Sequence, residues 1–130
     1  MASYFVYVIS CKGGSLYTGI TTDVARRLRE HLSGKAPGAR YTRVWPPQGL
    51  AVVWQTEGRV AASRLEWRIK HLSAVQKRSL VADPKTVAEL QGLEADDLYT
   101  PLAPRELEAL WRQAADNRSS SAVAQKSRAA

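Results

Sequence analysis

The sequence predicts an α+β fold in which amphipathic helices flank a small sheet. Residues 4–10 and 15–20 are rich in β-branched and aromatic side chains, and a Gly-Gly pair separates them, which is the pattern of a β-hairpin. Residues 50–56 have the composition of a third strand, and segments with a helical spacing of apolar residues lie between and after the strands. With 130 residues, 45% of them apolar, the chain can bury one core of ordinary size.

In the hairpin, the length of the turn decides which side chains share a face. If an odd number of residues forms the turn around Lys12, Tyr7 and Tyr17 lie on the same face, opposite or diagonal to each other. An even number would separate them. We predict the same face, so that the two phenol groups lie close together.

The first helix is predicted over residues 23–33, with Thr21 or Thr22 as its cap and Gly34 at its end. Its apolar stripe consists of Val24, Leu28 and Leu32. Arg27 and His31 lie one turn apart at the edge of this stripe, so we expect both side chains where the helix meets the sheet.

Residues 34–49 are rich in Gly and Pro and contain no acidic residue, and Pro46-Pro47 predicts an irregular loop. The loop is a candidate nucleic-acid contact, because cations meet phosphates and an aromatic ring stacks on an unpaired base. Without such a partner it would be a solvated loop with Trp45 packed on the core. The residues proposed to bind nucleic acid are Lys35, Arg40, Tyr41 and Arg43.

Three further helices complete the fold. The helix over residues 61–72 places Glu66 at one edge of its apolar stripe, and Ser73 caps a helix that continues through Leu80. A C-terminal helix over residues 104–115 has a clear apolar stripe, which would cover the core or bind a protein partner or a second copy of the chain. A second candidate nucleic-acid surface lies on the 61–72 helix and comprises Arg64, Trp67, Arg68 and His71. The alternative is that the C-terminal helix covers this surface.

Charge is unevenly distributed along the chain. Residues 1–82 contain 13 Lys/Arg and 4 Asp/Glu, a net charge of +9, whereas residues 83–130 have a net charge of −2. A basic half of this size favours a polyanion partner, most simply nucleic acid, although a soluble basic protein without one would have the same charge. We predict a domain over residues 1–82, a helical extension over 83–118 and a disordered tail over 119–130.

The composition also limits the setting. Cys11 is the only cysteine, so neither an internal disulfide nor a cysteine-rich zinc site can form. The sequence has no apolar run long enough to cross a membrane and no signal-peptide pattern. We therefore expect a soluble cytoplasmic protein.

The side chains of Tyr7, Tyr17, Arg27, His31 and Glu66 suit phosphodiester hydrolysis. A tyrosine is a base only when it is partly ionised, and cations such as Arg27 lower its pKa from about 10. The guanidinium also binds phosphate through two parallel bonds, and Glu66 would hold Mg²⁺ or Mn²⁺ together with water and substrate oxygens. Each residue also has a structural interpretation: the tyrosines as packing residues, Arg27 paired with Asp23 or Glu30, His31 at a helix C-terminus, and Glu66 paired with Lys70.

Taken together, the motifs resemble the GIY-YIG nuclease superfamily, especially its small stand-alone bacterial members, which are similar to the catalytic domain of structure-selective endonucleases. Phe5-Val6-Tyr7 stands where the family has Gly-Ile-Tyr, and Tyr17-Thr18-Gly19 stands where it has Tyr-Ile-Gly. The helix with Arg27 and His31, the stretch Gly38–Thr42 and the segment around Glu66 also match. The resemblance covers residues 4–82.

The resemblance implies a three-stranded antiparallel sheet flanked by helices and Mg²⁺-dependent cleavage with a single metal at Glu66. It implies that Tyr7 assists or performs water activation, Tyr17 positions water or phosphate, Arg27 stabilises the phosphate and His31 supports proton transfer, with Gly19 structural at the site. It leaves open which of the two tyrosines is the base. The main hypothesis is a metal-dependent DNA endonuclease of repair or recombination that acts on branched or single-stranded DNA. The alternative is a nucleic-acid-binding module with a weak or vestigial nuclease site.

Overall fold

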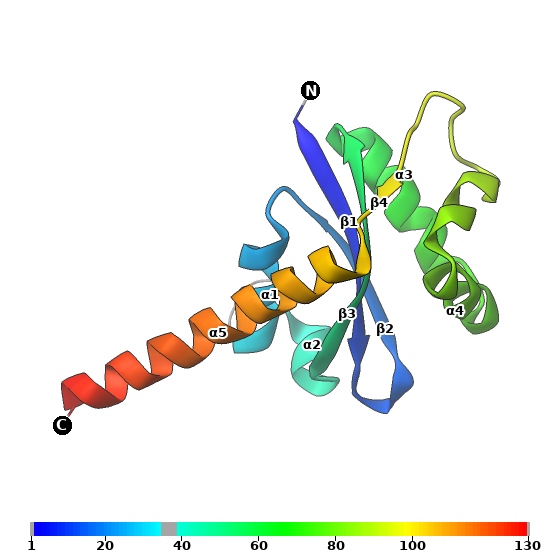
Figure 1. Cartoon of the computed structure of the whole chain (residues 1–130). Helices are drawn as coiled ribbons and strands as arrows, with labels where there is room; N and C mark the ends of the chain where they lie inside the picture. Colours follow the sequence, from blue (N-terminus) through cyan, green and yellow to red (C-terminus); the bar gives the residue numbers. More distant parts are fainter. Residues whose placement is uncertain (1, 35–38, 130) are drawn as a thin grey trace.

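The computed structural model describes residues 2–34 and 39–129, with side chains as far as residue 116. Its centre is an antiparallel sheet in the order β2-β1-β3-β4 (Figure 1). The strands are β1 (Ser3–Cys11), β2 (Leu16–Thr21), β3 (Pro47–Glu57) and β4 (Thr100–Pro101). The predicted hairpin and third strand are confirmed. The fourth strand consists of two residues that pair with Trp54 and Gln55, which is too short a stretch to show a strand pattern in the sequence.

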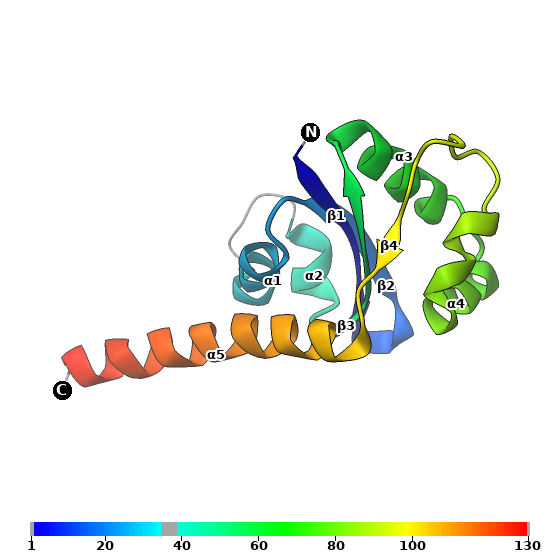
Figure 2. The same ribbon diagram turned by 45° about the horizontal axis from the view of Figure 1, so that its top comes forward.

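Helices cover both faces of the sheet. On one side lie α1 (Val24–Ser33), α2 (Arg40–Val44) and the first part of α5 (Pro104–Ala129), and on the other lie α3 (Arg59–Lys70) and α4 (Ala74–Ala82) (Figures 1 and 2). Short 3₁₀ turns, η1 (Lys12–Gly14) and η2 (Pro84–Glu89), follow β1 and α4. Within the described residues, no helix is long and apolar enough to cross a membrane.

The alternation of side chains along β1 divides the core in two. Val6 and Val8 point to the side of α3 and α4, where Trp54 is fully buried and donates a hydrogen bond of 3.0 Å from Nε1 to the carbonyl oxygen of Pro84. The intervening Tyr7, together with Ile9, points to the side of α1 and α5. The tyrosine of the first motif is therefore a core residue of the α1 side.

Three boundaries differ from the sequence-based prediction. Asp23 itself caps α1, because its side chain accepts a hydrogen bond from the backbone N–H of Arg26, so the cap lies one or two residues later than expected. The predicted irregular loop contains α2, and Pro47 already begins β3, where the first position of a strand tolerates proline. The C-terminal helix continues to Ala129, through the segment for which composition predicts disorder, and its distal part projects away from the sheet (Figure 1).

The apolar stripe of α5 contacts the chain's own core. Leu107, Leu110, Trp111 and Ala114 pack with Val24, Leu28 and Val53 in the core of the α1 side. A protein partner or self-association through this helix stays a prediction, as does the division of the chain at residue 82.

Candidate active site

The two tyrosines lie on the same face of the hairpin, as the odd-length turn predicts. Tyr7 pairs with Gly19 and Tyr17 with Ile9, which makes the two phenol rings diagonal neighbours with centroids 6.4 Å apart. A Cβ atom on Gly19 would lie within 2.6 Å of Cζ of Tyr7. Glycine at this position therefore lets the Tyr7 ring lie across the edge strand β2.

His31 holds the hydroxyl of Tyr7 in place. Tyr7 Oη and His31 Nε2 are 3.0 Å apart, and both residues are buried, with 2% and 1% of their surface exposed. On the other side of the ring, Nδ1 lies 2.9 Å from Oγ1 of Thr42. The Thr42 hydroxyl donates to the backbone oxygen of Ala39 at 3.1 Å, so its oxygen accepts a hydrogen bond from Nδ1–H of His31.

These contacts assign one tautomer to the imidazole. Since Nδ1 carries the proton, Nε2 is an acceptor, and the phenol O–H of Tyr7 donates to it. Burial lowers the pKa of His31 to about 4, and the positive charge of Arg27 contributes to this shift. At neutral pH the ring is therefore uncharged, and its Nε2 accepts the hydrogen bond from Tyr7.

Burial also raises the pKa of Tyr7 to about 12, and the charges of Tyr17 and Glu66 act in the same direction. Arg27 donates a hydrogen bond to the phenol oxygen and lowers the pKa, but its effect is smaller than that of burial. Arg27 thus favours the phenolate as expected, but burial outweighs its effect, and the phenol of the resting site is protonated at neutral pH. The sequence shows the cation but not the depth at which the ring is buried.

Arg27 connects the phenol with a carboxylate of its own helix. Its Nη1 lies 2.7 Å from Oε2 of Glu30, which confirms the structural pairing considered from the sequence, and 20% of its side chain is exposed. The same guanidinium contacts Tyr7. Arg27 thus lies between the buried tyrosine and solvent, where a phosphate could approach it.

Glu66 approaches the tyrosines from α3, on the other side of the sheet. Its charge is close enough to raise the pKa of Tyr7, and 25% of its side chain is exposed. Lys70 lies 3.4 Å from Oε2 of Glu66, and the same ammonium group lies 5.9 Å from the centre of the Tyr17 ring. The structure therefore places Tyr7, Tyr17, Arg27, His31 and Glu66 around the β2 edge of the sheet.

The donor set limits which metal the site could hold. Among the described residues, no three His, Cys, Asp or Glu side chains are grouped as a metal cage would require. A single, partly exposed carboxylate fits Mg²⁺ or Mn²⁺, which take most of their oxygens from water and phosphate, and it does not fit a structural zinc site.

A family model described as the GIY-YIG catalytic domain matches residues 3–79. The chain belongs to the GIY-YIG family. The match contains both tyrosine motifs, α1 and the glutamate of α3, so the residues around the β2 edge all lie within the matched domain.

Relatives named as UPF0213 proteins match a little over half of the chain. The UPF0213 protein BH0048 of Halalkalibacterium halodurans is 46% identical over 80 residues, which are 62% of this chain and 83% of that protein. A UPF0213 protein of Halobacterium salinarum is 47% identical over 77 residues, which are 59% of this chain and 97% of that protein. The solution NMR structure of BH0048 from Bacillus halodurans has 40% sequence identity to this chain. The comparison covers 71% of this chain and 99% of that chain, with a TM-score of 0.41.

Thr42 is the residue of this GIY-YIG site that the sequence did not reveal. It is 2% exposed on α2, within a segment predicted to be irregular. The available signal was a lone hydroxyl residue between cationic and aromatic side chains, which does not show that Thr42 faces inward. Only the short helix brings its hydroxyl to His31.

The predicted nucleic-acid residues have different surroundings. Lys35 lies outside the described residues. Arg40 and Tyr41 are exposed on α2, and the Tyr41 ring lies 5.4 Å from that of Tyr17, next to the catalytic region. Arg43 is exposed but donates a hydrogen bond of 2.8 Å to the backbone oxygen of Gly34, so part of its guanidinium is already used.

The second candidate surface, on α3, is not covered by α5. Arg64 instead forms a 2.7 Å ion pair with Asp97, and Arg68 donates to the backbone oxygen of Gln91. Trp67 stacks on His71 at 4.0 Å and stays exposed. Most of the charge on this surface therefore holds the segment after η2 against α3.

Proposed function

We propose that this GIY-YIG protein is a metal-dependent endonuclease that hydrolyses DNA phosphodiester bonds in repair or recombination. The observation that carries the proposal is the buried chain of hydrogen bonds from Tyr7 through His31 to Thr42. Aromatic packing alone does not require a phenol, an imidazole and a hydroxyl in line. Each of these polar groups costs desolvation free energy when it is buried and must be hydrogen-bonded to offset that cost. At one end of these hydrogen bonds, Tyr7 lies close enough to Glu66 for the carboxylate to raise its pKa.

The chain of hydrogen bonds provides a route for one proton. A water molecule beside Tyr7 attacks phosphorus and gives its proton to Oη, while the phenol proton passes to Nε2 of His31. The new P–O bond forms as the bond from phosphorus to the leaving oxygen breaks; the leaving oxygen takes up a proton from solvent water, and His31 afterwards returns its extra proton to solvent. Because the pKa of Tyr7 is raised and that of His31 is lowered, both groups are neutral before substrate binds, and Tyr7 acts as a relay instead of a standing phenolate.

The remaining residues bind charge. Arg27 donates to the oxygens of the phosphate, exchanging its contact with Glu30 for the substrate. Tyr17 positions the water or the phosphate beside Tyr7. Glu66 would hold Mg²⁺ or Mn²⁺, and such an ion would supply positive charge to stabilise the phosphate and the leaving oxygen.

Branched or single-stranded DNA is the proposed substrate. The described residues form one sheet with its helices and include no second module to read a duplex sequence. Recognition would therefore depend on the shape and the unpaired segments of the DNA.

The test is cleavage of labelled flap, fork, duplex and single-stranded oligonucleotides with Mg²⁺ or Mn²⁺. We expect Glu66→Gln to lower the cleavage rate by roughly 100-fold or more, because it removes the charge that holds the metal. Glu89→Gln, which changes an exposed glutamate at the end of η2, is the matched control and should cleave like wild type. Cleavage by Glu66→Gln at the wild-type rate would show that the metal site is wrongly assigned. Binding without metal-dependent cleavage in any variant would favour the alternative of a nucleic-acid-binding module.

A further inference from the structure

A cavity lies beside the catalytic region and is not used by the proposed reaction. Its volume is about 250 Å³, and it lies between the end of the β1–β2 turn, α2 and the beginning of α4. Tyr41 lines it from α2, and Lys77 and Arg78 line it from α4. It is therefore an open site made of an aromatic ring and two cations.

Tyr41 connects this cavity with the catalytic tyrosines. Its ring lies 5.4 Å from that of Tyr17, which in turn lies 5.0 Å from the imidazole of His31. The three rings form a row that begins at the buried relay and ends at the cavity wall. With 36% of its surface exposed, Tyr41 leaves part of its ring open to a ligand.

The charge of the cavity has one sign. No acidic side chain lines it, and neither Lys77 nor Arg78 forms an ion pair with any residue that the structure describes. By contrast, Arg27, Arg64 and Lys70 each have a carboxylate partner. Two cations without such a partner beside an exposed aromatic ring are the elements of a single-strand binding site, in which bases stack and phosphates meet cations.

We infer that this cavity binds an unpaired nucleotide of the substrate strand, next to the bond that is cut. The base stacks on Tyr41, and Lys77 and Arg78 hold the adjoining phosphates. The inference rests on the proposed function, and it adds the reason why a single-stranded segment would be preferred. A duplex keeps its bases stacked on one another and cannot offer one to Tyr41.

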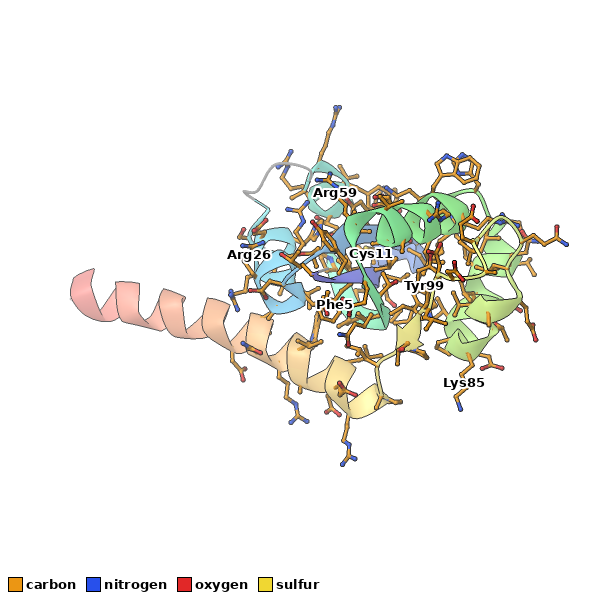
Figure 3. All side chains as sticks on the ribbon, turned by 90° about the horizontal axis from the view of Figure 1, so that it is seen from above. Phe5, Cys11, Arg26, Arg59, Lys85 and Tyr99 are labelled. Carbon is orange, nitrogen blue, oxygen red and sulfur yellow. The ribbon has the colours of Figure 1, made fainter. Side chains whose placement is uncertain are left out.

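Binding can be tested without cleavage. Fluorescence anisotropy without metal would compare a labelled single-stranded oligonucleotide with a blunt duplex of equal length. We expect the double variant Lys77→Glu/Arg78→Glu to weaken single-strand binding roughly 10-fold or more, and to reduce the slope of log K against log salt by about 1.4. The matched control is Lys85→Glu/Arg105→Glu, which makes the same change in net charge at exposed positions on η2 and α5. Lys85 points outward, far from Arg26 of α1 (Figure 3).

The aromatic contact has its own pair of variants. Tyr41→Ala should weaken single-strand binding roughly 5-fold or more, and blunt-duplex binding less, because only an unpaired base can stack on the ring. Tyr41→Phe keeps the ring and should bind like wild type. Circular dichroism would verify that each variant is folded.

The outcomes separate this inference from the proposed function. The inference is overturned if the cavity variants lose no more affinity than the control pair, if duplex binding falls as much as single-strand binding, or if wild type binds no DNA. Specific binding through the cavity in a protein that cuts nothing would support the inference and contradict the endonuclease. Glu66-dependent cleavage that the cavity variants leave unchanged, with unchanged DNA affinity, would contradict the inference alone.

Discussion

The hydroxyl of Tyr7 donates a 3.0 Å hydrogen bond to Nε2 of His31 in a region almost closed to solvent. The two residues belong to neighbouring elements, a central strand and the helix after the hairpin, and neither side chain can move without leaving a buried polar atom unpaired. This geometry makes the relay fixed in direction, with the phenol as donor and the imidazole as acceptor. It also makes the site sensitive to the residues that hold each ring.

Thr42 should act as a positioning residue for His31. Thr42→Val keeps the shape but removes the acceptor for Nδ1–H, so we expect cleavage to fall roughly 10-fold and the protein to lose about 1–3 kcal/mol of stability. Thr42→Ser keeps the hydroxyl and should keep the cleavage rate and the stability near those of wild type. Nitrogen chemical shifts of the imidazole report the tautomer directly, and an unchanged tautomer in Thr42→Val would remove the assigned role.

Gly19 should tolerate no side chain. Gly19→Ala places a methyl group against the ring of Tyr7, which is buried and cannot swing away without breaking its bond to His31. We expect a loss of about 1–3 kcal/mol in the free energy of unfolding and a strong loss of cleavage. Gly49→Ala on β3 is the control, because its Cβ would meet no atom within 4 Å. Equal stability of the two variants in denaturant titrations would argue against a close-packed site.

Arg27 should matter for cleavage and little for stability. Arg27 and Arg26 are both close to Glu30, but Arg26 is 58% exposed, with its nitrogen 3.8 Å from the carboxylate, and it points away from the sheet (Figure 3). Arg27→Ala should lower cleavage by roughly 100-fold, because a cation facing the phosphate is lost. Arg26→Ala should cleave nearly normally, and neither the part-buried Arg27–Glu30 pair nor the exposed Arg26–Glu30 pair should contribute more than about 1 kcal/mol to stability. Parallel kinetics and thermal melts of the two variants provide the comparison, and similar rates would place the phosphate elsewhere.

His31 should make the fold less stable in mild acid. Its pKa is about 4 in the folded protein and near 6.5 when exposed, so between these values the unfolded chain binds a proton that the folded chain does not. Stability should therefore fall as pH drops from 6.5 towards 4, by about 3 kcal/mol in all. Urea titrations at several pH values would measure this slope. His31→Gln should lack this part of the dependence, and an identical slope in both proteins would show that His31 is not buried as a neutral ring.

Much of the local geometry was predictable because it follows from strict periodicities. The period of two along the hairpin, with an odd-length turn, fixed the shared face of Tyr7 and Tyr17. The helical period placed Arg27 and His31 at the border of the α1 stripe, and Gly34 ends that helix in the left-handed conformation as expected.

The parts that escaped prediction depend on contacts between distant segments. Thr42 approaches His31 only because α2 forms in a stretch whose glycines and prolines predict a loop. Strand β4 exists because residues 100 and 101 meet β3, and not because of its own composition. The raised pKa of Tyr7 reflects the packing of α1 and α5 against its face of the sheet, which no local pattern encodes.

The unequal burial of the site has a consequence for how the protein changes over generations. Tyr7 and His31 are part of the core, so replacing either costs stability as well as chemistry, whereas Glu66 is partly exposed and paired only with its neighbour Lys70. Sequence drift can therefore remove the carboxylate proposed to hold the metal while the fold survives intact. A descendant of this chain would lose Glu66 before it lost the paired ring groups that mark its ancestry.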